Sequence, residues 1–107
     1  MEMSKFVLAA HTSEIEPGEA ISFETDDYII AVFNVDGEFY AIEDNCTHSN
    51  APLSQGEVMD CVVVCPYHAA EFDLKTGEVL CRPATEPVRT FNVKVEGDSI
   101  MVDIERD

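Results

Sequence analysis

Two short segments each carry one cysteine and one histidine: Cys46-Thr47-His48 and Cys65-Pro66-Tyr67-His68. Thiolate sulfur and imidazole nitrogen are ligands of both zinc and iron. The commonest zinc spacing puts two cysteines in one segment and two histidines in another, whereas here each segment supplies one of each. This mixed pairing is typical of a [2Fe-2S] cluster in which one iron has two thiolates and the other two histidines. We therefore expect Cys46 and Cys65 on one iron, and His48 and His68 on the other.

Further segments on both sides of these pairs point to one known family. They are Ala51-Pro52-Leu53-Ser54, Glu71-Phe72-Asp73-Leu74-Lys75-Thr76-Gly77 and Pro83-Ala84-Thr85-Glu86-Pro87. Together with the ligand pairs they resemble the Rieske ferredoxins, the electron-carrier components of bacterial aromatic-ring-hydroxylating dioxygenase systems. The resemblance covers roughly residues 5 to 104, and the ligand motif is highly specific in a chain of this size. It implies that the cysteines bind the inner iron and the histidines the outer one.

The resemblance also implies a function. The chain would be a soluble one-electron carrier that passes electrons from an NAD(P)H-dependent ferredoxin reductase, a flavoprotein, to a terminal oxygenase in aromatic hydrocarbon catabolism. Its cofactor would be one Rieske [2Fe-2S] cluster, and the carrier itself would catalyse no reaction. Only His11 remains beyond the ligand pairs, so we expect no mononuclear iron site of the oxygenase kind.

Two alternatives stay open at this stage. One keeps the cluster and changes the partner, making the chain a Rieske component of a nitrite reductase or of another oxygenase system. The other is of a different class: a structural zinc module that uses the same Cys2His2 set.

Size and charge limit the possible partners. A chain of 107 residues is expected to form a single domain, residues 1–107, and is expected to be monomeric. The formal net charge of -16 argues against nucleic acid and anionic membrane surfaces, so partners should be basic where they dock. The best candidates for steering are the carboxylates that flank the ligand pairs: Glu43, Asp44, Glu71 and Asp73. No apolar run is long enough to span a membrane and no signal segment is visible, so we expect a cytoplasmic protein.

Two cysteines, Cys61 and Cys81, are left over from the ligand set. A reducing compartment favours free thiols, although a disulfide between them stays open. We expect Cys61 to lie within an apolar strand as a small core residue.

The elements that must position the ligands are short strands, because turn residues are dense and helical periodicity is absent. We expect an all-β Rieske fold: an antiparallel β-sandwich or barrel base with a small inserted cluster-binding subdomain at about residues 43–80. The dipeptide Asp36-Gly37 predicts a tight hairpin, and Asp60 is expected to adopt a left-handed conformation in a second turn. The two ligand segments are expected at the tips of loops on one small sheet. The expected strands are residues 6–10, 20–25, 28–35, 38–42, 62–64, 71–73, 78–80, 88–96 and 100–104.

The neighbours of the ligands predict a low reduction potential. High-potential Rieske proteins have a disulfide at the positions that Ala51 and Tyr67 occupy here. They also carry a serine and a tyrosine whose hydroxyls donate hydrogen bonds to cluster and cysteine sulfur, at the positions of Ala70 and Phe72. Each missing donor removes stabilisation of the added electron. We expect a potential near about -150 mV, the low end for this type of cluster.

Overall fold

The protein is built from short antiparallel strands, which confirms the all-β prediction. The computed structural model describes residues 5–25, 28–44, 52–65, 70–81 and 87–104. In these ranges the strands are β1 (Phe6–His11), β2 (Ala20–Glu24), β3 (Ile29–Val35), β4 (Glu38–Glu43), β5 (Glu57–Met59), β6 (Val62–Val64), β7 (Glu71–Asp73), β8 (Val79–Cys81), β9 (Thr90–Phe91), β10 (Val93–Glu96) and β11 (Ser99–Asp103). Two 3-10 turns, η1 (Thr12–Glu14) and η2 (Leu53–Gln55), complete the described elements.

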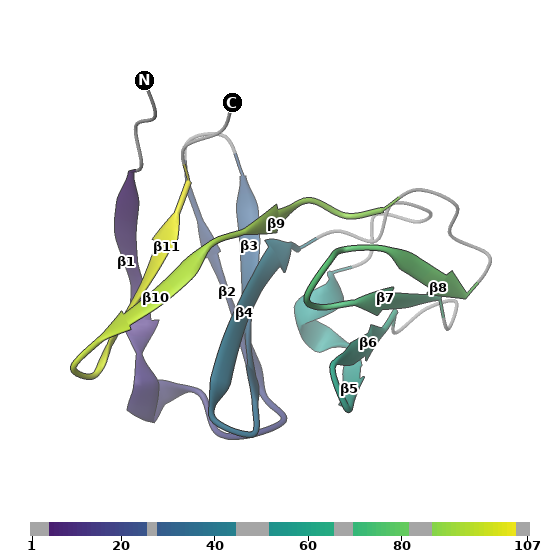
Figure 1. The fold of residues 1–107 in the computed structure, drawn as a ribbon, viewed down its shortest axis with the longest axis horizontal. Helices are drawn as coiled ribbons and strands as arrows, with labels where there is room; N and C mark the ends of the chain where they lie inside the picture. Colours follow the sequence, from purple (N-terminus) through teal and green to yellow (C-terminus); the bar gives the residue numbers. More distant parts are fainter. Residues whose placement is uncertain (1–4, 26–27, 45–51, 66–69, 82–86, 105–107) are drawn as a thin grey trace.

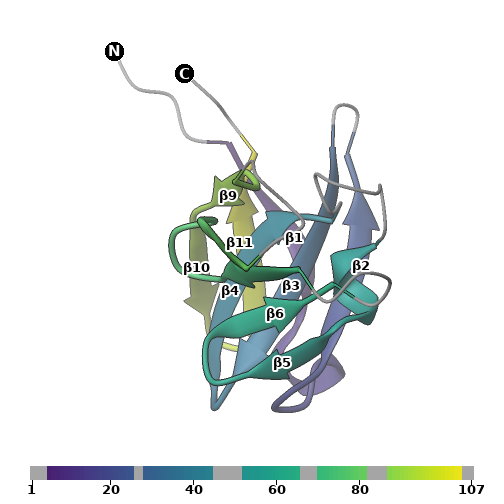
Figure 2. The same cartoon turned by 90° about the vertical axis from the view of Figure 1, so that its right-hand side faces the viewer.

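The strands form three antiparallel sheets with the orders β1-β11-β10, β2-β3-β4-β9 and β5-β6-β7-β8. The first two sheets make the base, and the third lies against the side of that base (Figures 1 and 2). All strands of the third sheet come from one continuous part of the chain, residues 57–81. This arrangement confirms the predicted fold class. The subdomain limits of about 43 and 80 stay a prediction.

β3 explains how the layers are held together, because both of its faces are buried. Ile30 and Val32 pack into a core shared with β11, whereas Ala31 and Phe33 pack into a second core shared with the third sheet. All four side chains are 0% exposed. A strand that is covered on both faces reads as a continuous apolar run rather than an alternating one, as the sequence of β3 does.

Tight turns fix the register of the hairpins. Asp36 and Gly37, between β3 and β4, have φ values of 53° and 93°, as a type I′ turn requires. Asp60, between β5 and β6, has φ 57°. Both turn predictions are therefore confirmed, including the left-handed aspartate.

Two local expectations were wrong. The expected strand over residues 88–96 is divided: β9 pairs with β4 in the second sheet, and β10 pairs with β11 in the first. Alternation alone could not reveal this, because the pattern continues while the hydrogen-bonding partner changes. Cys61 lies in the turn after β5 rather than inside a strand, and its side chain is half-buried.

The turn between β7 and β8 joins the third sheet to the base. The backbone N–H of Val88 donates to the carbonyl of Gly77 at 2.9 Å, and Gly77 has φ 79°. A side chain at Gly77 would overlap the carbonyl oxygen of Val88. Glycine thus lets two backbones approach at this joint.

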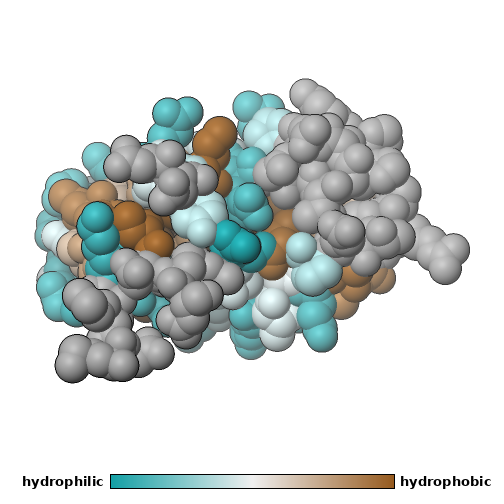
Figure 3. Space-filling view, turned by 90° about the horizontal axis from the view of Figure 1, so that it is seen from above, coloured by the Kyte–Doolittle hydropathy of each residue, from teal (hydrophilic) through white to brown (hydrophobic). Residues whose placement is uncertain are grey.

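On the face seen from above, the described residues show hydrophilic side chains interspersed with separate hydrophobic patches (Figure 3). The large apolar side chains that are exposed are scattered over several elements: Leu8, Ile29, Met59, Leu80 and Val95. In the described part of the chain, no helix has the length and apolar character needed to cross a membrane.

Candidate metal centre

Of the four predicted ligands, the structure describes Cys65. This residue comes directly after β6 and is 2% exposed. Cys46, His48 and His68 lie outside the described residues, so their assignment as ligands stays a prediction. What the structure shows is how the chain enters and leaves each ligand segment. We call residues 45–51 the first ligand arm and residues 66–69 the second ligand arm.

The two ends of the second ligand arm are joined by a backbone hydrogen bond. The N–H of Cys65 donates to the carbonyl of Ala70 at 2.7 Å. The pairing of β6 with β7 begins next to this bond, where Val64 lies opposite Glu71. The arm that would carry His68 therefore begins and ends on adjacent strands.

The first ligand arm is joined in a different way. Asp44, directly before the arm, accepts hydrogen bonds from the backbone N–H of Ser54 at 2.7 Å and from its hydroxyl at 2.8 Å. The N–H of Asp44 donates to the carbonyl of Ile29 at 2.8 Å. One carboxylate thus connects the two ends of the arm, and its backbone is fastened to the base.

The ends of both arms meet in one buried core. Ile42 and Leu53 flank the first arm, Cys65 and Ala70 flank the second, and all four belong to the same hydrophobic cluster. Two loops whose ends share a core are suited to supply ligands to a common site. The expectation that both arms hang on one small sheet was wrong, however. The first arm leaves β4 of the base and leads into η2, before the third sheet begins.

Cys65 lies in apolar surroundings. Its cluster contains Phe72 and Leu74, which are 0% and 1% exposed and bring no polar side-chain atom. These apolar side chains keep water away from the sulfur of Cys65, which is 2% exposed. In the described ranges no three His, Cys, Asp or Glu side chains come together in a group that could hold a metal ion.

Two of the four predicted steering carboxylates also make hydrogen bonds that shape the chain around them. Asp44 is 7% exposed and is held by Ser54, so its carboxylate is not available for direct contact with a partner. Asp73 accepts backbone N–H groups of Lys75 at 2.7 Å and Thr76 at 3.3 Å, which shapes the β7–β8 turn. Glu43, Glu71 and Asp73 are half-buried and remain candidates for steering. The role of Ser54 was missed. The sequence offered a weak signal for it: Asp44 and Ser54, which can hydrogen-bond to each other, stand on either side of the first ligand pair.

A group of polar side chains lies at the seam between the base and the third sheet. The hydroxyl of Tyr40 donates to Glu38 at 2.8 Å, and this hydrogen bond raises the pKa of Tyr40. Burial raises the pKa of the Cys61 thiol nearby, and Tyr40 and Lys75 offset part of that rise. Cys61 is a free thiol, as expected, while the side chain of Cys81 lies outside the description. A thiol that stays protonated is a poor nucleophile.

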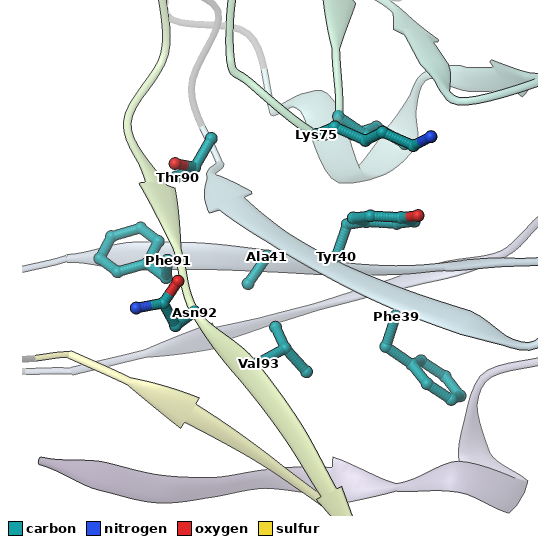
Figure 4. A pocket seen from close by; sticks show the side chains of 9 residues that line it. Phe39, Tyr40, Ala41, Lys75, Thr90, Phe91, Asn92 and Val93 are labelled. Atoms are coloured by element: carbon teal, nitrogen blue, oxygen red, sulfur yellow. The ribbon is translucent and has the colours of Figure 1, made fainter. Parts of the chain in front are cut away.

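A pocket of about 240 Å³ opens beside this group (Figure 4). Lys75 reaches over Tyr40 from the β7–β8 turn, and β4, β9 and β10 supply the opposite walls. The lining residues are Phe39, Tyr40, Ala41, Leu74, Lys75, Thr90, Phe91, Asn92 and Val93. None of these described lining residues is a cysteine, histidine or carboxylate, so they offer the pocket no metal ligand of those kinds.

Comparisons with known proteins identify the family of the chain. The family described as "Rieske [2Fe-2S] domain" matches residues 5–92. The chain is 48% identical over 99 residues to the 3-phenylpropionate/cinnamic acid dioxygenase ferredoxin subunit of Shigella boydii, with 92% of each chain covered.

Solved structures with the same fold were also found. A chain from a complex of reduced oxygenase and oxidized ferredoxin in carbazole 1,9a-dioxygenase superposes with a TM-score of 0.89 at 32% identity, with 95% of each chain covered. A putative NADH-dependent nitrite reductase small subunit from Mycobacterium tuberculosis superposes equally well, at 0.89, with 99% of this chain and 100% of that chain covered. Its identity is 24%, so this likeness concerns the fold alone.

Proposed function

Because the chain belongs to the Rieske [2Fe-2S] domain family, we propose that it carries single electrons from an NAD(P)H-dependent ferredoxin reductase to the terminal oxygenase of an aromatic-ring-hydroxylating dioxygenase. The observation that carries this proposal is the 48% identity, over nearly the whole length of both chains, to a dioxygenase ferredoxin subunit. The chain is an electron-transfer component, as its relatives are, and not the oxygenase that acts on the aromatic ring.

The cofactor is one Rieske-type [2Fe-2S] cluster. When bound, it supplies a reversible one-electron couple whose potential depends on ligands, hydrogen bonds and burial. We propose Cys46 and Cys65 as its thiolate ligands and His48 and His68 as its imidazole ligands. The support is the buried position of Cys65 and the shared core at the ends of both arms.

The chain's own residues favour a low potential. Ala70 and Phe72 are fully buried in the same cluster as Cys65, and neither has a hydroxyl that could donate to sulfur. The backbone N–H of Cys65 donates its hydrogen bond to the carbonyl of Ala70. With fewer donors to stabilise added negative charge, a potential near about -150 mV is part of the proposal.

The oxygenase and the reductase are proposed as partners on different grounds. A similar chain has been solved in a complex with the oxygenase of carbazole 1,9a-dioxygenase, which supports an oxygenase as the acceptor. The reductase follows from the need for an electron source, since a carrier must be reduced before each transfer. A net charge of -16 favours partners with basic docking surfaces and makes association sensitive to salt. We also propose that the carrier is cytoplasmic, because NAD(P)H is a cytoplasmic reductant. We further propose that it is monomeric.

The alternatives have less support. Membership of an iron-sulfur family removes the reason for a zinc module. The nitrite reductase component shares the fold, but its identity is half that of the dioxygenase ferredoxin subunit, at 24% against 48%.

A reconstituted system tests the proposal. Cluster-loaded protein is combined with NADH, a ferredoxin reductase and the oxygenase of a 3-phenylpropionate-type dioxygenase, and product is measured as the carrier concentration is varied. Hydroxylated product should require the carrier, and its rate should fall as salt rises. Failure with this oxygenase, together with carrier-dependent nitrite reduction by a nitrite reductase, would contradict the proposal in favour of the alternative.

A further inference from the structure

A buried carboxylate lies at the start of the first ligand arm. Asp44 is 7% exposed, and both of its carboxylate oxygens accept hydrogen bonds from Ser54, on the far side of the arm. Its backbone N–H is bound to the carbonyl of Ile29 in β3. The position of this carboxylate is therefore fixed from two directions.

The charge of Asp44 has no cation beside it in the described chain. Both donors from Ser54 are neutral. The ion pair found within the described ranges joins Lys94 to Glu96 at 3.3 Å. It lies on β10, in the other sheet of the base. Burial of a carboxylate without a cation costs free energy. A neutral asparagine could accept one of the two hydrogen bonds at less cost, so the negative charge itself calls for a reason.

We propose that Asp44 is a positioning residue for the first ligand arm and that its fixed negative charge lowers the potential of the cluster. The inference rests on the proposed ligand assignment, since Asp44 stands two residues before Cys46. Two residues of extended chain span no more than about 7 Å between Cα atoms. A negative charge near a site that accepts an electron disfavours the reduced form.

The expected size follows from Coulomb's law. For unit charges about 10 Å apart, an effective dielectric constant of about 40 changes a one-electron equilibrium by about fourfold, and one of about 20 by about sixteenfold. A fourfold change corresponds to about 35 mV, at 59 mV for each tenfold step of a one-electron couple.

The test compares three variants of the cluster-loaded protein by redox titration followed in the visible spectrum. Asp44→Asn removes the charge and keeps the shape. Asp36→Asn is the matched control, because it removes an equal charge from the exposed turn at the other end of β4, where asparagine tolerates φ 53°. Ser54→Ala keeps the carboxylate and removes one of its two donors. The proposal expects the ratio of reduced to oxidised protein at fixed potential to rise fourfold or more in Asp44→Asn, and less than twofold in the other two.

A second readout tests positioning apart from charge. The rate at which a chelator bleaches the visible absorbance should rise severalfold in Asp44→Asn and in Ser54→Ala, and should be unchanged in Asp36→Asn. If Asp44→Asn holds no cluster, Ser54→Ala decides: faster bleaching supports the proposal and an unchanged rate overturns it. Equal potentials in Asp44→Asn and Asp36→Asn would also overturn it. A wild-type protein without a cluster would instead contradict the proposed function.

Discussion

Gly77 and Gly97 offer a direct test of how the third sheet is fastened to the base. Both glycines have left-handed φ, 79° and 62°, and both lie in turns between paired strands. Alanine at either position bears the cost of that conformation, about 1–2 kcal/mol. The difference lies in their surroundings. A methyl group on Gly97 would meet nothing within 4 Å, whereas one on Gly77 would overlap the carbonyl oxygen of Val88 and lie 3.0 Å from Cγ2 of Thr90.

The extra cost at Gly77 can be estimated from the contacts that must change. To admit the methyl group, the chain at Val88 has to move and lose its hydrogen bond to Gly77, which costs about 1–3 kcal/mol for a buried pair. Overpacking of the surrounding core adds about 1–3 kcal/mol. Gly77→Ala is therefore expected to destabilise the protein by at least about 2 kcal/mol more than Gly97→Ala does.

Urea unfolding followed by circular dichroism gives both free energies, and the visible spectrum reports the cluster in the same samples. Gly77→Ala should lower cluster content as well as stability, because Gly77 lies in the turn between β7 and β8, and β7 begins directly after Ala70. Gly97→Ala should keep a full cluster. Equal losses of stability in the two variants would show that the close approach to Val88 adds no cost at Gly77, since backbone strain alone would then account for both.

Two further predictions concern potential and pH. Phe72→Tyr places a hydroxyl in the apolar cluster around Cys65. A hydrogen bond from it that favours the reduced state by about 1.4 kcal/mol should raise the reduction potential, measured by redox titration, by about 60 mV. Phe72→Leu adds no donor and should not raise the potential, and a rise in both variants would contradict the explanation. The pKa values of Cys61 and Tyr40 are raised in the folded protein, so deprotonation favours the unfolded chain, and the urea midpoint should fall as pH rises above about 8.5 to 10. That fall should be smaller in Cys61→Ser and Tyr40→Phe, and an equal fall in all three proteins would speak against these two groups as its cause.

Much of the fold was predictable because local signals and tertiary structure agree. Asp36-Gly37 specifies a tight turn through its own backbone preferences, and the structure has that turn. The hairpin from β10 to β11 follows an alternating pattern, and Ile100 and Val102 face the core. These features depend on residues that are neighbours in the sequence.

Features that depend on distant partners were harder to predict. The division between β9 and β10 reflects a change of neighbouring strand, which leaves no trace in the alternation. Asp44 was predicted to steer a partner because it flanks a ligand pair, yet the fold buries it against Ser54. In the candidate site, residue types and spacing predict which side chains bind iron. How the ends of the arms are joined requires the three-dimensional arrangement.

Electron paramagnetic resonance of the dithionite-reduced protein tests the central claim, that two cysteines and two histidines hold one [2Fe-2S] cluster. We expect a coloured protein whose reduced form gives a rhombic signal with an average g value below that of the free electron, and coupling to nitrogen that is reduced when His48 or His68 is replaced. A colourless protein with bound zinc, or a cluster signal without nitrogen coupling, would contradict it.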